Sequence, residues 1–93
     1  MLNFNAENIE DLEEEARERA IEVSVEVVTA VTKALESGAD KVVVGILSSI
    51  DMDLSVDKAN YLEALETNLN RCAEAEEFEL CDVASKWIKK LRE

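Results

Sequence analysis

The 93-residue sequence contains no histidine, no proline and only two glycines. Histidine is the commonest general base and the commonest metal ligand of proteins, so its absence removes the usual means of both kinds of chemistry. Two cysteines alone cannot complete a tetrahedral zinc site or a disulfide framework. No serine or cysteine nucleophile has a histidine base, and no glycine-rich phosphate loop occurs. We therefore expect no enzyme, no metal and no cofactor.

Basic residues are also scarce, because 10 Lys and Arg stand against 22 Asp and Glu, a formal net charge of −12. Contacts to phosphates need clustered Lys and Arg, so we expect no direct binding to nucleic acid. The sequence shows neither a signal peptide nor an apolar run of the length of a membrane helix, about 20 residues. The longest run near the middle covers residues 42–47. We predict a cytoplasmic protein with reduced thiols and no membrane contact.

The scarcity of proline and glycine favours helices joined by short turns, and this length suits one domain, residues 1–93. Apolar residues recur every three or four positions over about residues 6–36, which predicts one long helix. Asn5 is suited to cap its start, and Gly38 its end. The members of the apolar stripe are Ile9, Leu12, Ala16, Ala20, Val23, Val27, Val31, Ala34 and Leu35.

Two stretches have a pattern that is compatible with either a strand or a helix. Within residues 21–31, apolar and polar side chains alternate as in a half-buried strand, but the helical stripe continues through them without a break. The short element at residues 40–50 contains a valine-rich run, 41–47, which is compatible with a buried strand or with a helix. We favour helix for both stretches, and for the second only because it agrees with the rest of the chain.

A helix over residues 6–36 would be about 46 Å long, whereas a domain of this size has a radius of gyration of about 13 Å. Apolar side chains also surround this helix between residues 21 and 32, with Val25 and Val28 away from the main stripe. A helix that is apolar on every side is buried on several faces. We therefore expect a homodimer in which Val25 and Val28 bind the partner. The alternative is a central helix that its own neighbours surround.

The last third of the chain predicts a helical hairpin at about residues 56–92. Ser55 is suited to cap a helix over residues 56–74, and a polar break separates it from a last helix at about 78–92. Together with the first helix, this hairpin predicts an all-α protein. We expect a small three- to four-helix bundle with a long first helix and a C-terminal helical hairpin.

A recognisable spacing runs through this hairpin. It is carried by Leu65, Leu69, Cys72, Ala73, Phe78, Glu79, Cys81, Ile88 and Leu91. The pattern resembles the UVR motif of excision-repair proteins and of some protease-adaptor and chaperone-associated proteins. It departs from that motif at Asp82, where a small residue is usual, and at residues 84–86, where Leu-Arg-Asp is usual. The resemblance implies an antiparallel helix pair used for protein–protein contact. Both cysteines would then be small packing residues, with a redox cross-link as the alternative.

Oxygen-bearing side chains alternate at Asp51, Asp53, Ser55 and Asp57, as at the start of an EF-hand calcium loop. Such a loop needs glycine at its sixth position and glutamate at its twelfth, where this sequence has valine and leucine. We therefore expect a capping turn here and no metal site. A calcium-responsive protein is therefore the least favoured of three functional hypotheses; an interaction module and an inhibitor are the other two.

Glutamates are concentrated on the first predicted helix, where Glu10, Glu14 and Glu18 follow one another at one-turn spacing. They form either a solvated face or an electrostatic surface for a basic partner.

Trp87 lies one position off the stripe of the last helix, so it is either the edge of the core or an anchor for a partner. The leading hypothesis is a non-catalytic protein–protein interaction module, a small regulator or adaptor. The alternative is an inhibitor whose acidic faces imitate DNA.

Overall fold

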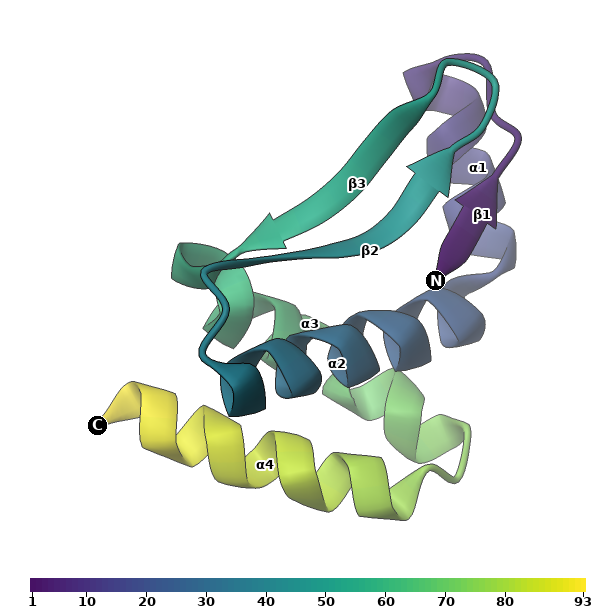
Figure 1. The fold of residues 1–93 in the computed structure, drawn as a ribbon. Coiled ribbons are helices and arrows are strands. Elements are labelled where there is room, and N and C mark those ends of the chain that lie inside the picture. The colour runs from purple at the N-terminus through teal and green to yellow at the C-terminus, as the bar shows by residue number, and fades with distance from the viewer.

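The computed structural model describes all 93 residues and combines four α-helices with a three-stranded sheet (Figure 1). The elements are β1 (Leu2–Phe4), α1 (Ile9–Glu18), α2 (Ala20–Ser37), β2 (Lys41–Leu47), β3 (Met52–Asp57), the 3-10 helix η1 (Lys58–Asn60), α3 (Tyr61–Glu74) and α4 (Phe78–Arg92). The prediction of an all-α helical bundle is therefore wrong, because the chain has an α/β fold. In Figure 1, α2 lies between the sheet and α4, and α1 lies at one end of the sheet.

The sheet has the order β1-β2-β3, with β1 parallel and β3 antiparallel to β2. Leu2 pairs with Gly45, so β1 covers only the last part of β2. A glycine is suited to this position because a Cβ on it would lie 3.1 Å from both the Cβ and the carbonyl oxygen of Leu2. A bulge between Val43 and Gly45 interrupts the pairing with β3. Bulges bend strands, and β2 and β3 curve along their length in Figure 1.

The valine-rich run at 41–47 is thus a strand, and the apparent capping turn that follows it is part of β3. A short apolar run does not reveal its period, so its neighbours in space decide between strand and helix. Val42 pairs with Val56, and both pack against the main core. Ser55 lies exposed inside β3 and caps no helix. The other open stretch, residues 21–31, is helical as expected.

The long helix expected over residues 6–36 is instead two helices that meet at Arg19. Asn8, not Asn5, caps the first of them, because its side chain accepts a hydrogen bond of 2.9 Å from the backbone N–H of Asp11. Gly38 ends α2 in the left-handed conformation, with φ of 74°, as expected for a C-cap glycine. The break lets α1 turn back along the sheet, so no single helix overhangs the domain.

Contacts of Arg19 hold this break in place. Its guanidinium donates hydrogen bonds to the carboxylates of Glu15 and Glu22. It also donates to the carbonyl oxygen of Asn3 over 2.9 Å and lies 5.0 Å from the centre of the Phe4 ring. The hydrogen bond with Glu22 is the main cause of a raised pKa of Arg19 and a lowered pKa of Glu22. The junction of α1 and α2 is therefore tied to β1.

The main core lies between α2, α3 and α4. Its buried members are Val28, Val31, Ala34, Tyr61, Leu65, Cys72, Ala84 and Ile88. A smaller core lies between the sheet and α1, with Leu2, Phe4, Ala6 and Leu47 as its buried members. The two helices expected within 56–92 are present as α3 and α4, although α3 begins only at Tyr61. None of the helices has both the length and the apolar character that crossing a bilayer requires.

Candidate functional site

The most apolar hollow of the surface lies beside the smaller core, between the first turns of α1 and the turn that joins β2 to β3. We call it the apolar groove. Its volume is about 450 Å³, and no polar atom is exposed on its lining. Its residues are Ala6, Asn8, Ile9, Leu12, Leu47, Ile50, Met52 and Leu54. Two segments that are far apart in the sequence therefore build one site.

Three side chains of the groove are unusually exposed for apolar residues. Ile9 is 73 % exposed, Ile50 52 % and Met52 51 %. They are three of the seven large apolar residues that the whole surface exposes. Ile50 also lies in a turn, where polar residues and glycine are usual. Exposed apolar side chains gathered around a concave surface indicate a binding site.

Hydrogen bonds fix the shape of the groove. The backbone N–H of Ser48 donates to the carbonyl oxygen of Phe4 over 3.0 Å, and the Ser48 hydroxyl donates to the side chain of Asn3. The Ser49 hydroxyl donates to the carbonyl oxygen of Ala6. These bonds join the β2–β3 turn to the segment around β1, and the N-cap bond described above fixes the start of α1. The groove is thus formed before a partner binds, which lowers the entropic cost of binding.

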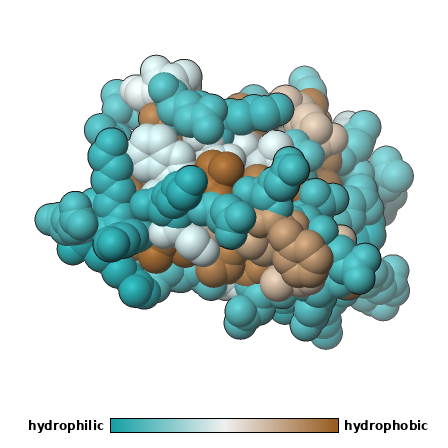
Figure 2. Space-filling model, turned by 90° about the horizontal axis from the view of Figure 1, so that it is seen from below, coloured by the Kyte–Doolittle hydropathy of each residue, from teal (hydrophilic) through white to brown (hydrophobic).

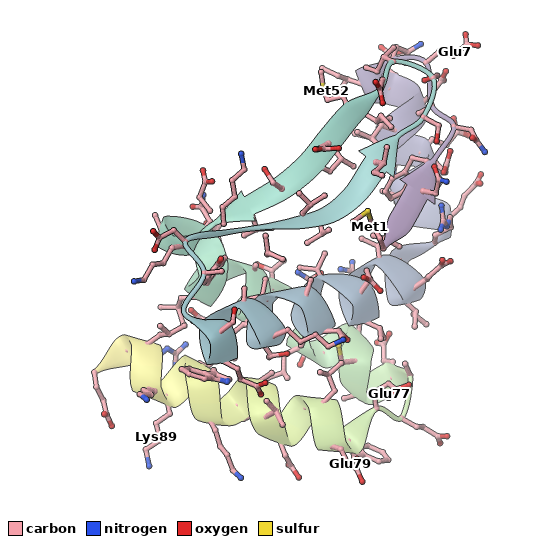
Figure 3. All side chains as sticks on the ribbon, in the orientation of Figure 1. Met1, Glu7, Met52, Glu77, Glu79 and Lys89 are labelled. Atoms are coloured by element: carbon pink, nitrogen blue, oxygen red, sulfur yellow. The ribbon has the colours of Figure 1, made fainter.

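Carboxylates flank the lining residues of the groove in the sequence. Residues 5–16 contain six Asp and Glu, residues 46–57 contain three more, and neither segment contains Lys or Arg. Of these nine carboxylates, only Glu15 forms an ion pair, with Arg19 at 3.1 Å. We call the exposed carboxylates adjacent in sequence to the lining residues the acidic rim: Glu7, Glu10, Asp11, Glu13, Asp51 and Asp53. Figure 3 shows Glu7 and Met52 at the same end of the molecule, with Lys89 at the other.

The residues predicted to bind a partner lie in different places. Glu10, Glu14 and Glu18 are exposed on α1, and of these only Glu10 belongs to the acidic rim. Val28 has no exposed surface and lies in the main core, and Val25 is half-buried against that core. Of the two side chains of α2 that were expected to bind a second copy, Val28 is therefore covered by neighbours within the same chain, and Val25 partly so.

Trp87, the remaining predicted residue, lies on α4. It is half-buried against the main core, and the Lys90 ammonium lies 5.0 Å from the centre of one of its rings. Phe78, on the same helix, is 62 % exposed. The face seen in Figure 2 shows hydrophobic residues between hydrophilic ones, but no residue of α4 lines a hollow. This helix lacks the concave shape of the apolar groove.

Sequence reasoning missed Ile9, Ile50 and Met52 as site residues. Ile9 fits the apolar stripe of the predicted helix, which points to a core, and Met52 lies among the aspartates of the apparent calcium loop. The one signal in the sequence was Ile50, an isoleucine between Ser49 and Asp51 in a stretch with turn-like composition. The groove itself could not be seen, because its two walls meet only through the sheet.

The cysteines lie at the contact between α3 and α4. Cys72 is buried in the main core, and Cys81 is half-buried against it. The Cys72 thiol donates a weak hydrogen bond of 3.7 Å to the carbonyl oxygen of Ser24. Burial raises the pKa of Cys72 to about 11, which makes its thiolate scarce at neutral pH. No group of three or more Cys, Asp and Glu side chains is placed to hold a metal ion.

No protein family, curated protein or solved structure matches this chain. The resemblance of residues 65–91 to the UVR motif therefore stays an expectation, neither supported nor contradicted.

Proposed function

We propose that this protein is a non-catalytic protein–protein interaction module, a small regulator or adaptor, and that it binds its partner through the apolar groove. The observation that carries the proposal is the gathering of Ile9, Ile50 and Met52, all exposed, around a preformed hollow. A partner that covered these side chains would remove apolar surface from water, which is the main driving force of most protein association.

The composition of the groove favours a protein partner over a small metabolite. Sites for small molecules combine an apolar lining with a few polar groups that orient the ligand. The apolar groove exposes no polar atom on its lining, and its charged groups lie outside it in the acidic rim. An apolar centre inside a polar rim is the usual arrangement of a protein–protein interface.

An inhibitor that imitates DNA is the second candidate, and α1 supports it. None of the residues of α1 is buried, and Glu10, Glu14 and Glu18 have no ion-pair partner. Binding through this helix would depend on charge, so it would weaken steeply as salt is added. Binding through the apolar groove would persist, because burial of apolar surface is not screened by salt.

Two finer expectations belong to this proposal. A homodimer would have to use a surface other than Val28, because that residue is inside the main core; we therefore propose a different protein as the partner. We also propose a cytoplasmic location, since Cys72 and Cys81 are both free thiols and free thiols are usual in reducing compartments.

Capture from a lysate of the source cell tests the proposed function. Three immobilised proteins are compared: the unaltered chain, the groove variant Ile9→Ser/Met52→Ser, and the control Phe78→Ser, which changes a similarly exposed residue outside the groove. We expect the first and third to retain the same protein at about 0.5 M salt, and the groove variant to lose it. Equal retention by the groove variant would contradict the proposal. Loss at high salt and displacement by duplex DNA would favour the DNA-imitating alternative.

A further inference from the structure

We infer that the occupant of the apolar groove is a basic amphipathic segment of another protein. Its apolar side chains would fill the groove, and its Lys or Arg side chains would face the acidic rim. The inference rests on the proposed function and adds the chemistry of the partner to it.

The charge around the groove is the first argument. The acidic rim holds six exposed carboxylates, none of which has a cation of this chain as its partner. The cations nearest to the groove in sequence are Arg17, Arg19, Lys41 and Lys58, and none of them forms an ion pair with these six carboxylates. Arg19 binds Glu15 and Glu22, and Lys58 lies 3.9 Å from Asp40, beyond the opposite end of β3. Carboxylates of one sign around a binding surface attract a positively charged partner and repel others.

A second copy of this chain does not have the required chemistry. Two grooves placed against each other would bring two acidic rims together, and opposed like charges disfavour association. The basic stretch of this chain lies near the end of α4, but Ile88 there is buried and Trp87 is half-buried in the same chain. Arg92 is also paired with Glu66. This stretch therefore has charge, but of its large apolar residues only Leu91, which is 36 % exposed, is free to enter a groove.

The shape of the groove is the second argument for an amphipathic segment. The two walls, α1 and the β2–β3 turn, leave an open hollow rather than a closed cavity, with Ile9, Ile50 and Met52 exposed at its edges. A helix with apolar residues on one face and basic residues beside them would bury these edges and place its cations over the rim. A wholly apolar segment would leave the six carboxylates without partners.

Three synthetic helical peptides test the inference. They share the same leucines at positions i, i+4 and i+7 and differ only in the flanking residues, which are Lys, Gln or Glu. Binding is measured by fluorescence anisotropy to the unaltered chain and to the groove variant Ile9→Ser/Met52→Ser. A rim variant, Glu7→Gln/Glu10→Gln/Asp51→Asn, removes three charges next to the groove; asparagine is accepted at position 51, where φ is 51°.

A matched control removes three charges at the other end of the molecule. Glu79→Gln/Asp82→Asn/Glu93→Gln changes exposed residues on or after α4 and alters the net charge by the same amount. Figure 3 shows Glu79 on α4, far from Glu7. This control separates an effect of the acidic rim from an effect of net charge.

We expect the Lys peptide to bind about tenfold more tightly than the Gln peptide at low salt, and the Glu peptide not to bind. The rim variant should lose about fivefold in affinity for the Lys peptide and the control less than about twofold, with both differences shrinking at about 0.5 M salt. The groove variant should not bind. Equal binding of the Lys and Gln peptides, or equal loss in rim variant and control, would overturn the inference and leave the proposed function standing. Peptide binding that survives in the groove variant would overturn both.

Discussion

The side chains of the apolar groove should be nearly dispensable for folding, in contrast to those of the main core. Full burial of a large aliphatic side chain contributes about 1.5–3 kcal/mol. Ile9 is 73 % exposed, so only about a quarter of that contribution, about 0.4–0.8 kcal/mol, is at stake in Ile9→Ser. Serine and isoleucine have similar helix propensities, so the backbone adds little. Leu65, in contrast, has no exposed surface, and Leu65→Ala should cost about 3–5 kcal/mol.

Urea unfolding and thermal unfolding, each followed by circular dichroism, measure both changes. For a domain of this size, 1 kcal/mol corresponds to about 4–8 °C in Tm, so Ile9→Ser should lower Tm by about 2–6 °C and Leu65→Ala by more than about 12 °C. Phe78→Ser, at a similarly exposed position outside the groove, should resemble Ile9→Ser. A loss above about 2 kcal/mol for Ile9→Ser would refute the reasoning, because it would show that Ile9 is needed by the fold and is not available to a partner.

Four further predictions concern the fold. Gly45→Ala should destabilise by about 1–3 kcal/mol through overpacking against Leu2, and hydrogen exchange should show faster opening of β1. Gly38→Ala meets no neighbouring atom but forces alanine to φ of 74°, so urea unfolding should show a loss of about 1–2 kcal/mol. The pKa of Cys72 is raised by burial from 9 to about 11; the free energy of unfolding should therefore fall as pH rises through that range, because the unfolded thiol ionises first. The Cys72→Ala variant should lack this part of the pH dependence. Arg19→Ala should lower Tm, and less so at high salt, since the variant removes two ion pairs from the junction of α1 and α2.

Helices could be predicted where the apolar pattern is long and periodic. The secondary structure of a short apolar run could not. The stripe from Val23 to Leu35 continues for more than three turns, so α2 follows from the sequence, and Gly38 marks its end. The run at 41–47 is too short to show whether its apolar residues follow the period of a helix or that of a strand. It became a strand because β1 and β3 supply partners for its backbone. These partners are far from it or joined through a turn, so no local rule reveals them.

The break at Arg19 also depends on residues that are distant in the sequence. The apolar stripe passes through this position without interruption, and arginine is a good helix former. The chain departs from the helix there because the guanidinium meets the carbonyl oxygen of Asn3 and the ring of Phe4. Both belong to β1, whose position depends on β2. The prediction of a homodimer depended on the unbroken helix and on an uncovered Val28, and neither is present in the structure.

The sequence by itself determined the charge, the scarcity of catalytic and metal-binding side chains, and the helical character of residues 20–37, 61–74 and 78–92, although not where the first two of these helices begin, because these features depend on composition or on local periodicity. Only the tertiary structure decided the sheet, the break between α1 and α2, and the apolar groove, because each depends on contacts between distant segments. Ile9 and Ile50 lie on separate elements, and pairing of β1 with β2 brings them to one hollow. The sequence also contained the six carboxylates of the acidic rim, but only the fold brings together the two segments that carry them.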